Sequence, residues 1–260
     1  MRIYEIEAYF DTLYPSERRC EWDNDGLLIC PDRRKEVTKV LTCLDVTFSA
    51  IEKARAEGCE LIVSHHPMLF SPIHRINEDS VVGQKILLLL EAGISLISLH
   101  TRFDAAVGGL NDAFAQSLGL LPERIGSLLE DEPYIGGIGI LPAKYTPSEL
   151  ARHVSRVLSS PVKIYSAELD IEKVGYCCGS GKDLVKTCLS IGTDAFIGGD
   201  IPYHTALDAV ELGMTVIDCG HFASEKSAPH IFRTALGAFS TDIEVIPFFE
   251  DLGGEIVSFI

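Results

Sequence analysis

The chain has 260 residues, enough for one large domain or two modest ones. Its composition is 47% apolar and 23% charged, as in ordinary soluble globular proteins, and no apolar run approaches the roughly 18 residues that span a bilayer. Acidic residues outnumber basic ones by 38 to 22, which argues against non-specific binding to nucleic acid and favours cations as partners. A nucleotide bound through a metal ion remains compatible with this charge.

The N-terminus and the cysteines together predict a cytoplasmic protein. Met1–Glu5 is too polar for a secretory signal. The eight cysteines contain no C-x-x-C pair, and several stand in apolar, strand-like segments. We therefore expect reduced thiols that act as small core residues rather than disulfides or zinc ligands. Neither a membrane nor DNA is expected as a partner.

Two α/β segments are predicted, one on each side of a central stretch. Ahead of the first segment, Trp22 is expected to anchor the N-terminal part of the chain. The first segment alternates strands with helices, and a glycine ends each helix. Its elements are a strand at Val37–Val46, a helix at Phe48–Glu57, a strand at Leu61–Ser64, a helix at Val81–Ala92 and a strand at Ile94–Leu99.

The central stretch, Leu121–Ser160, contains a glycine-rich strand at Tyr134–Leu141 and a helix at Thr146–Leu158. Thr146 is followed by a proline and then by Glu149, which is the capping-box pattern of a helix start. A boundary near residue 125 would divide the chain into halves at 1–125 and 126–260.

The second segment repeats the alternation of strands and helices. Its elements are a strand at Val174–Cys178, a helix at Lys182–Ile191, a strand at Ala195–Ile197, a helix at Tyr203–Leu212 and a strand at Thr215–Asp218. Continuous apolar strands between helices favour parallel pairing, with the helices covering the faces of the sheet. We therefore expect an α/β fold.

The two segments also resemble each other in sequence. Lys39–Cys43 parallels Lys173–Cys177, Gly58–Ser64 parallels Gly192–Gly198, and Glu91–Ile97 parallels Glu211–Ile217. Chance is the alternative explanation, because α/β proteins reuse glycine and branched apolar patterns. Three matched pieces in the same order favour an internal duplication.

Ligand-type residues follow the predicted strands of both segments. His100–Asp104 and His221–Glu225 are both His-x-x-x-acid pieces that leave a buried strand and enter a helix. A helix places residues i and i+4 on one face, where an imidazole and a carboxylate can share one metal ion or flank two. Strand carboxyl ends are also where open α/β sheets bind ligands.

A third such place is the pair His65 and His66, which follows Leu61–Ser64 and precedes Pro67. Adjacent side chains diverge, so each histidine would serve a different metal ion, and this favours a dinuclear site. The alternative for any single histidine is an ordinary surface or core residue. Metal binding is favoured because all three comparable strand ends carry ligand-type residues.

The remaining histidines lack this context, apart from His204. His74, His153 and His230 are expected to be ordinary. His204 stands at the corresponding strand end of the second segment and is expected to line the pocket.

Gly179–Asp183 resembles a phosphate loop but does not match one. Tyr176 occupies the position of the earlier glycine, and Asp183 stands where Ser or Thr is needed. We interpret this piece as a turn into a helix.

Together, these motifs resemble the Ngg-interacting-factor family, whose members are commonly labelled GTP cyclohydrolase 1 type 2 homologues. The resemblance runs nearly end to end, without the long central insertion of larger members. Its motifs are Trp22–Leu27, Leu44–Thr47, Ser64–Pro67, His100–Asp104, Gly108–Asp112, Gly199–Asp200 and Gly220–Glu225. The departures, at Asp25, Cys30, Arg102–Phe103 and Phe222, remove no ligand, but Arg102 is expected to bear on what the pocket accepts.

The resemblance implies an architecture, a site and an assembly. The fold would be two intertwined, internally duplicated α/β halves with mixed sheets and a metal site between them. The ligands of two divalent metal ions would be His65, His66, Asp104, His221 and Glu225, with Glu225 bridging the ions and His100 close by. The subunits would assemble as a toroidal homohexamer, a trimer of dimers.

Such a site predicts a metal-dependent hydrolase. Two nearby divalent ions supply a nucleophile at neutral pH and polarise a carbonyl or phosphoryl oxygen. Nitrogen and oxygen ligands suit zinc, iron or manganese, and this number of ligands leaves coordination positions open. His100 or His204 is the candidate general acid or base, and the family label implies a nucleotide such as GTP as the substrate. The alternatives are a metal-binding or metal-delivery protein without turnover and an adaptor in a regulatory complex.

Overall fold

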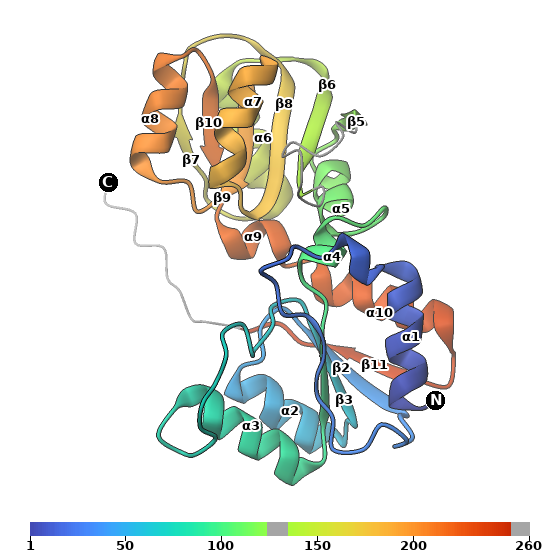
Figure 1. Ribbon diagram of the computed structural model, residues 1–260. Coiled ribbons are helices and arrows are strands. Elements are labelled where there is room, and N and C mark those ends of the chain that lie inside the picture. Colours follow the sequence, from blue (N-terminus) through green and yellow to red (C-terminus); the bar gives the residue numbers. More distant parts are fainter. Residues whose placement is uncertain (124–134, 251–260) are drawn as a thin grey trace. The chain divides into compact units, whose positions relative to one another are not determined.

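The computed structural model describes residues 1–123 and 135–250 of the chain (Figure 1). The chain forms two compact units that interleave along the sequence. Unit 1 consists of Met1–Thr12, Asn24–His100 and the chain from Ala228 onward, and unit 2 consists of Leu13–Asp23 and Thr101–Ser227. The predicted boundary at residue 125 lies outside the described residues, and the interleaved units differ from a division of the chain at one point.

Unit 1 is built on a five-stranded mixed sheet. The strands follow the order β1 (Gly26–Ile29), β4 (Ser95–Ser98), β3 (Leu61–Ser64), β2 (Lys39–Cys43) and β11 (Glu244–Pro247). Strands β4, β3, β2 and β11 run parallel, and β1 pairs antiparallel to β4 at the edge. The α/β class and the mixed pairing are therefore confirmed.

Alternate residues of β2 face the two helical layers of unit 1. Leu41 and Cys43 belong to the apolar core beneath α2 (Phe48–Glu57) and α3 (Val81–Ala92). Thr42 points the other way, and its Oγ1 donates a hydrogen bond to the carbonyl oxygen of Pro229, 2.9 Å away, in α10 (Ala228–Phe239). Helix α1 (Ile3–Leu13) packs on α10 in the same layer (Figure 1), with Phe10 edge-on to Phe232. The sheet is thus covered on both faces, as its continuous apolar strands predict.

Local sequence sets the ends of the two helices that follow β2 and β3. Thr47 and Ser80 are the N-caps of α2 and α3, each accepting a backbone N–H three residues ahead. Gly58 and Gly93 end these helices in the left-handed conformation, with φ of 72° and 63°. Each of the two helices therefore returns to the next strand of the sheet within a few residues.

Unit 2 is built on a six-stranded mixed sheet. The strands follow the order β5 (Leu121–Glu123), β6 (Gly137–Tyr145), β8 (Ile171–Ser180), β9 (Ala195–Gly199), β10 (Thr215–Asp218) and β7 (Lys163–Tyr165). Strands β8, β9 and β10 are parallel, and β5, β6 and β7 pair antiparallel at the two sides. The helices are α4 (Thr101–Asp104), α5 (Leu110–Ser117), α6 (Pro147–Leu158), α7 (Val185–Ile191), α8 (Tyr203–Glu211) and α9 (His221–Glu225), with short 3₁₀ turns at Ser16–Arg18 and Lys182–Leu184.

One face of the unit 2 sheet lies under α7 and α8 (Figure 1), where Cys177, Phe196 and Val216 form the core with Cys188 and Ala206. Helix α6 contacts β6 and β7. It begins with the predicted capping box, in which Thr146 and Glu149 satisfy each other's backbone N–H groups.

The register of the two sheets supports the internal duplication. Across the first sheet Val40, Leu61 and Ser95 are direct partners, and across the second Val174, Ala195 and Thr215 are. These are the positions that the sequence repeat matches. The acids before the middle strands also act alike, because Glu60 accepts the backbone N–H of Lys39 at 2.9 Å and Asp194 accepts that of Lys173 at 2.8 Å.

Smaller expectations concern the cysteines, Trp22 and the lengths of the helices. All eight cysteines are free, and all but Cys30 are buried, as expected for core thiols. Trp22 is 55% exposed, whereas Tyr14 and Cys20 nearby are buried, and its expected role as an anchor of the N-terminal segment stays a prediction. No helix among residues 1–123 and 135–250 is both long and apolar enough to cross a bilayer.

Candidate metal centre

In unit 1, three histidines meet at the carboxyl ends of neighbouring strands. His65 and His66 follow β3, and His100 follows β4. One ring nitrogen from each lies within 4.8 Å of the others, and the ring centroids of His65 and His100 are 5.2 Å apart. His65 is fully buried, and the other two are half-buried. Such a group of imidazoles is a donor set that fits a transition-metal ion.

Hydrogen bonds fix which nitrogen of His65 and His66 carries the proton. His65 Nδ1 lies 2.8 Å from the carbonyl oxygen of Leu99, and His66 Nδ1 lies 2.8 Å from Oδ1 of Asp45. A carbonyl and an ionised carboxylate only accept hydrogen bonds, so Nδ1 must donate in both cases. The lone pair is then on Nε2, which is the arrangement of metal-binding histidines supported by a carboxylate or a carbonyl.

In unit 2, the short helix α9 carries a histidine and a carboxylate on one face. His221 is its first residue and Glu225 its last, and His221 Nε2 lies 3.1 Å from Glu225 Oε2. Asp200 Oδ2 lies 2.7 Å from His221 Nδ1 and holds the proton there, so Nε2 directs its lone pair toward the Glu225 carboxylate. Two electron-pair donors on one metal ion, with bonds of about 2.1 Å, lie about 3.0–3.4 Å apart. The pair fits a shared cation; a second proton on the imidazole is the other way to satisfy it.

A glycine makes room for the Glu225 carboxylate. Gly179 stands at the end of β8 with φ of +62°, and a Cβ there would lie 2.2 Å from Glu225 Oε1. Glu225 is only 3% exposed, so the close approach of this backbone is part of what encloses the carboxylate.

Cys178, the residue of β8 before Gly179, contacts Asp104, the other proposed acidic ligand in unit 2. Cys178 Sγ donates to Asp104 Oδ1 over 3.6 Å. Asn111 connects the two backbones, since its Nδ2 donates to the Asp104 carbonyl at 3.3 Å and its Oδ1 accepts the Cys178 N–H at 2.9 Å. Burial, and next the Asp104 charge, raise the pKa of Cys178 well above its usual range, which keeps the thiol protonated as a donor.

The two His-x-x-x-acid pieces are not equivalent, contrary to the sequence expectation. His221 and Glu225 share a face of α9, whereas His100 precedes α4 and groups with the other histidines of unit 1, and Asp104 belongs to unit 2. The strand register explains the difference. Ser95 corresponds to Thr215, so His221 corresponds to Thr101, one residue after His100, and Glu225 corresponds to Ala105, one residue after Asp104.

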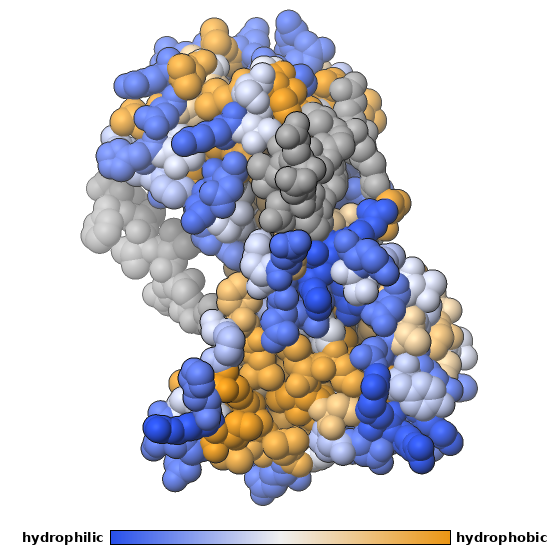
Figure 2. Space-filling model, in the orientation of Figure 1, coloured by the Kyte–Doolittle hydropathy of each residue, from blue (hydrophilic) through white to orange (hydrophobic). Residues whose placement is uncertain are grey.

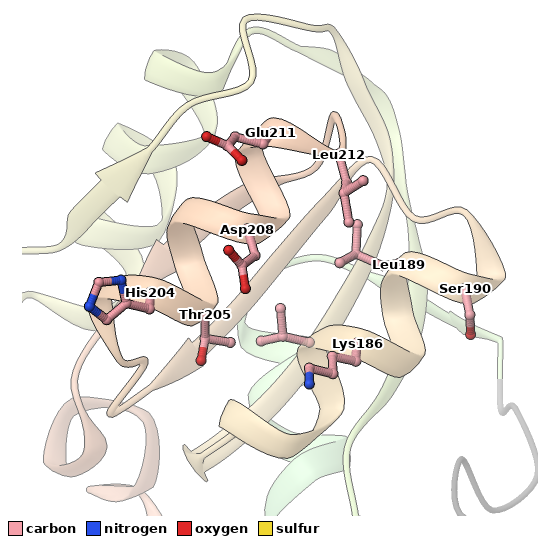
Figure 3. A pocket seen from close by; sticks show the side chains of 9 residues that line it. Lys186, Leu189, Ser190, His204, Thr205, Asp208, Glu211 and Leu212 are labelled. Carbon is pink, nitrogen blue, oxygen red and sulfur yellow. The ribbon is translucent and has the colours of Figure 1, made fainter.

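His204 lies in α8 and lines an open groove of about 830 Å³ between α7 and α8 (Figure 3). The groove also presents Lys186, Asp208 and Glu211. Among the residues that the structure describes, His204 belongs to neither of the candidate metal-binding groups. Its assignment as a catalytic acid or base stays a prediction.

His153, His230 and Arg102 have structural contacts. His153 Nε2 bonds the Leu118 carbonyl oxygen at 2.9 Å, and the His230 ring lies against Phe249. Arg102 is buried and donates to the carbonyl oxygen of Tyr14, so this contact binds the guanidinium to the protein's own backbone. In the Gly179–Asp183 piece, the first two residues end β8, and Lys182 begins the 3₁₀ turn that leads into α7, with the Gly181 N–H donating to the carbonyl oxygen of Gly199.

Sequence reasoning quoted Asp45 and Asp200 within motifs but gave them no role. A signal was available for Asp45. Val40 pairs with Leu61 across parallel strands, so Asp45 and His66, each five residues further on, continue the same register. Once two residues on parallel strands are known to be partners, counting the same number of residues beyond each identifies the side chains that lie next to each other at the strand ends.

Comparison with known proteins identifies the family of the chain. The family model described as Duf34/NIF3 (NGG1p interacting factor 3) matches residues 1–251. A Clostridium perfringens protein named GTP cyclohydrolase 1 type 2 homolog is 34% identical over 229 residues, covering 86% of this chain and 87% of that protein.

Solved structures resemble the chain over nearly its whole length. A Staphylococcus aureus protein covers 99% of each chain with a TM-score of 0.87 at 23% identity, which shows the fold alone. Reduced HcgD from Methanocaldococcus jannaschii covers 95% of this chain and 97% of its own, with a TM-score of 0.81 at 28% identity. With its family model spanning all but the last residues, the chain belongs to the Duf34/NIF3 (NGG1p interacting factor 3) family.

Proposed function

We propose that the chain binds two divalent metal ions through His65, His66, Asp104, His221 and Glu225, and that it is a metal-dependent hydrolase. The observation that carries the proposal is the pair of donors in α9. His221 Nε2 faces Glu225 Oε2 at 3.1 Å while Asp200 fixes the proton on the opposite nitrogen. The imidazole group of unit 1 supports it independently.

The connectivity of the chain supports a ligand set drawn from both units. The peptide bond between His100 and Thr101 joins the imidazole group of unit 1 to unit 2. Asp104 is four residues from His100, which even a fully extended chain spans in at most about 14 Å.

The donor chemistry supports catalysis rather than a purely structural metal. Nitrogen and oxygen donors suit zinc, iron or manganese, and the nearby thiols of Cys177 and Cys178 stay protonated because burial raises their pKa. Two divalent ions supply Lewis acidity and an activated water when bound. His100, beside His65 and His66, would then transfer a proton to or from the substrate, with His204 as the second candidate.

A nucleotide or related cyclic compound is the substrate class we propose. The name of the C. perfringens relative supports it. The net charge of −16 repels free phosphates, so a nucleotide would be held chiefly through the metal ions. The eight free thiols fit the cytoplasm as its location.

We also propose that the chain forms a homohexamer, and a face of α3 supports self-association. Gly83, Ile86 and Leu89 are buried in unit 1, but Leu87 and Leu90, on another side of the helix, are 42% and 46% exposed. Figure 2 shows apolar side chains gathered over the part of unit 1 that contains α2 and α3. A helix apolar on more than one side is normally covered, and a second copy would cover it.

Metal content and turnover test the proposed function together. Protein depleted with chelator is loaded with Mn, Fe or Zn, its metal content is measured by elemental analysis, and hydrolysis is followed across a nucleotide panel that includes GTP. We expect about two ions per wild-type chain, with reduced metal content and at least about a 100-fold loss of turnover in Glu225→Ala. His74→Ala, which changes an exposed histidine outside both metal-binding groups, should behave as wild type.

Two other results would favour the alternative functions. Stable metal binding with rapid exchange but no turnover of any compound would point to metal storage or delivery. A stable protein partner whose binding is unaffected by Glu225→Ala would point to a regulatory adaptor. A wild-type chain with no affinity for any divalent ion would rule out the proposal.

A further inference from the structure

We propose that Asp45 and Asp200 are positioning residues, each of which sets one histidine in the orientation and tautomer that a metal ion requires. The inference rests on the proposed metal site and adds to it residues that contact no ion themselves. Asp45 contacts Nδ1 of His66 in unit 1 at 2.8 Å, and Asp200 contacts Nδ1 of His221 in unit 2 at 2.7 Å.

The sheet itself creates the pair in unit 1. Strands β2 and β3 are parallel, with Cys43 opposite Ser64. Asp45 and His66 are each two residues beyond these partners, so they leave adjacent strands at the same depth. The carboxylate therefore reaches the imidazole at Nδ1, which leaves the lone pair on Nε2.

Unit 2 reaches the same arrangement by a different local conformation. Asp200 follows β9 and His221 follows β10, the neighbouring parallel strand. Asp200 has φ of +54°, a left-handed conformation that non-glycine residues adopt infrequently and that is tolerated at functional positions. Both units thus place an aspartate beside a histidine across two parallel strand ends.

Because both aspartates are exposed, their effect on the histidines can be measured separately from any effect on the stability of the fold. The side chains of Asp45 and Asp200 are 53% and 56% exposed, in contrast to the buried Asp104 and Glu225. Exposed pairs of this kind contribute little to the free energy of folding, since solvent screens them. Their removal should leave the fold intact and change the imidazoles alone.

An imidazole without such a partner is free to rotate and to exchange tautomers. A carboxylate that accepts from Nδ1 removes this freedom and makes Nε2 a better electron-pair donor. Loss of a comparable partner lowers metal affinity by about 10- to 100-fold in known metal sites. We expect this range for Asp45→Ala and for Asp200→Ala.

The first test needs no metal. Long-range ¹H–¹⁵N spectra of metal-free, ¹⁵N-histidine-labelled protein report which ring nitrogen carries the proton, with His66→Asn and His221→Asn assigning the signals. In the wild type both residues should show the Nδ1–H form. Asp45→Ala should reduce the population of the Nδ1–H tautomer in His66 alone, and Asp200→Ala should reduce it in His221 alone. Unchanged tautomers in these variants would overturn the proposal.

The second test measures the dissociation constant of Zn²⁺ or Mn²⁺ by competition with a chromogenic chelator. Asp45→Asn and Asp200→Asn keep an acceptor oxygen, so they should retain the tautomer and show affinities between the wild type and the alanine variants. Glu57→Gln removes an exposed acid that pairs with Lys53 at 2.7 Å and serves as the charge control, with no effect expected.

The two tests separate this proposal from the proposed function. If the wild type binds no metal while the tautomers respond as described, the metal site is ruled out, but the control of the histidine tautomers by the aspartates is supported. If the wild type binds metal and both alanine variants bind it with the same affinity, the positioning role is ruled out, but the metal site is supported.

Discussion

At the scale of single residues, the candidate site depends on Gly179 having no side chain. Gly179 combines a left-handed φ of +62° with a position where a Cβ would lie 2.2 Å from Glu225 Oε1. The contacted atom is the far end of a flexible side chain, so a larger residue here would move the carboxylate before it moved the backbone.

The substitution Gly179→Ala should therefore impair metal binding more than folding. The left-handed conformation costs roughly 1–2 kcal/mol for alanine, and the displaced Glu225 should lower metal affinity by about 10-fold or more. Gly192→Ala is the matched control, because Gly192 has φ of +73° and nothing within 4 Å of the added Cβ. Urea unfolding and metal titration of both variants would check this. Equal metal affinity in the two variants would contradict it.

The residues of the site were predictable to different degrees. His65, His66, His221 and Glu225 stand where buried strands end, and a single sequence shows this. Asp45 and Asp200 were missed because a partner across a sheet is recognised only once the strand register is known. The different positions of His100 and Asp104 could not be predicted either, because the same His-x-x-x-acid spacing lies within one helix at His221–Glu225 but not at His100–Asp104.

At the scale of secondary-structure elements, helix α7 packs on β8 through a thiol and a glycine. A Cβ at Gly175 would lie 2.4 Å from Cys188 Sγ, so the glycine allows the helix to approach the sheet. Burial raises the pKa of Cys188 to about 12, from an ordinary value of 9.0. The sequence predicted both elements, because glycines and apolar periodicity mark them, but not this contact between them.

The raised pKa predicts a specific loss of stability in alkali. Between pH 9 and 12 the unfolded chain releases the Cys188 proton while the folded chain retains it, so the free energy of unfolding falls as pH rises. One such group contributes up to about 1.4 kcal/mol per pH unit. Urea unfolding at pH 8, 9, 10 and 11 should show a shallower fall for Cys188→Ala than for the wild type. Parallel curves would contradict the assignment; Cys30→Ala, at a half-buried position, is the control.

At the scale of the whole molecule, the face of α3 bears on assembly. Leu90→Glu places a charge on this face and should reduce the mass in solution from about six times 28.4 kDa to a smaller species. Leu169→Glu is the control, because Leu169 is 57% exposed in unit 2. Light scattering after size exclusion measures both. A smaller species in both variants, or in neither, would argue against this face.

The family resemblance implied intertwined halves, but the local sequence pattern did not show which segments interleave. The repeat predicted two α/β segments, and both sheets contain its strands in the expected register. The segment from Ala228 onward was assigned to the second half because it follows it in the chain. Its strand β11 instead pairs with β2, and nothing in a local pattern specifies a partner so distant.

This late pairing has a consequence for how the protein is made. Lys39 and Glu244 are register partners, so this edge of the first sheet stays open until β11 has been translated. Until then, β2 exposes unpaired backbone groups to any other nascent chain, a known route to aggregation. The segments of unit 2 end at Ser227, so this unit can close on the ribosome before β11 is translated, and β11 then pairs with a strand that was made much earlier.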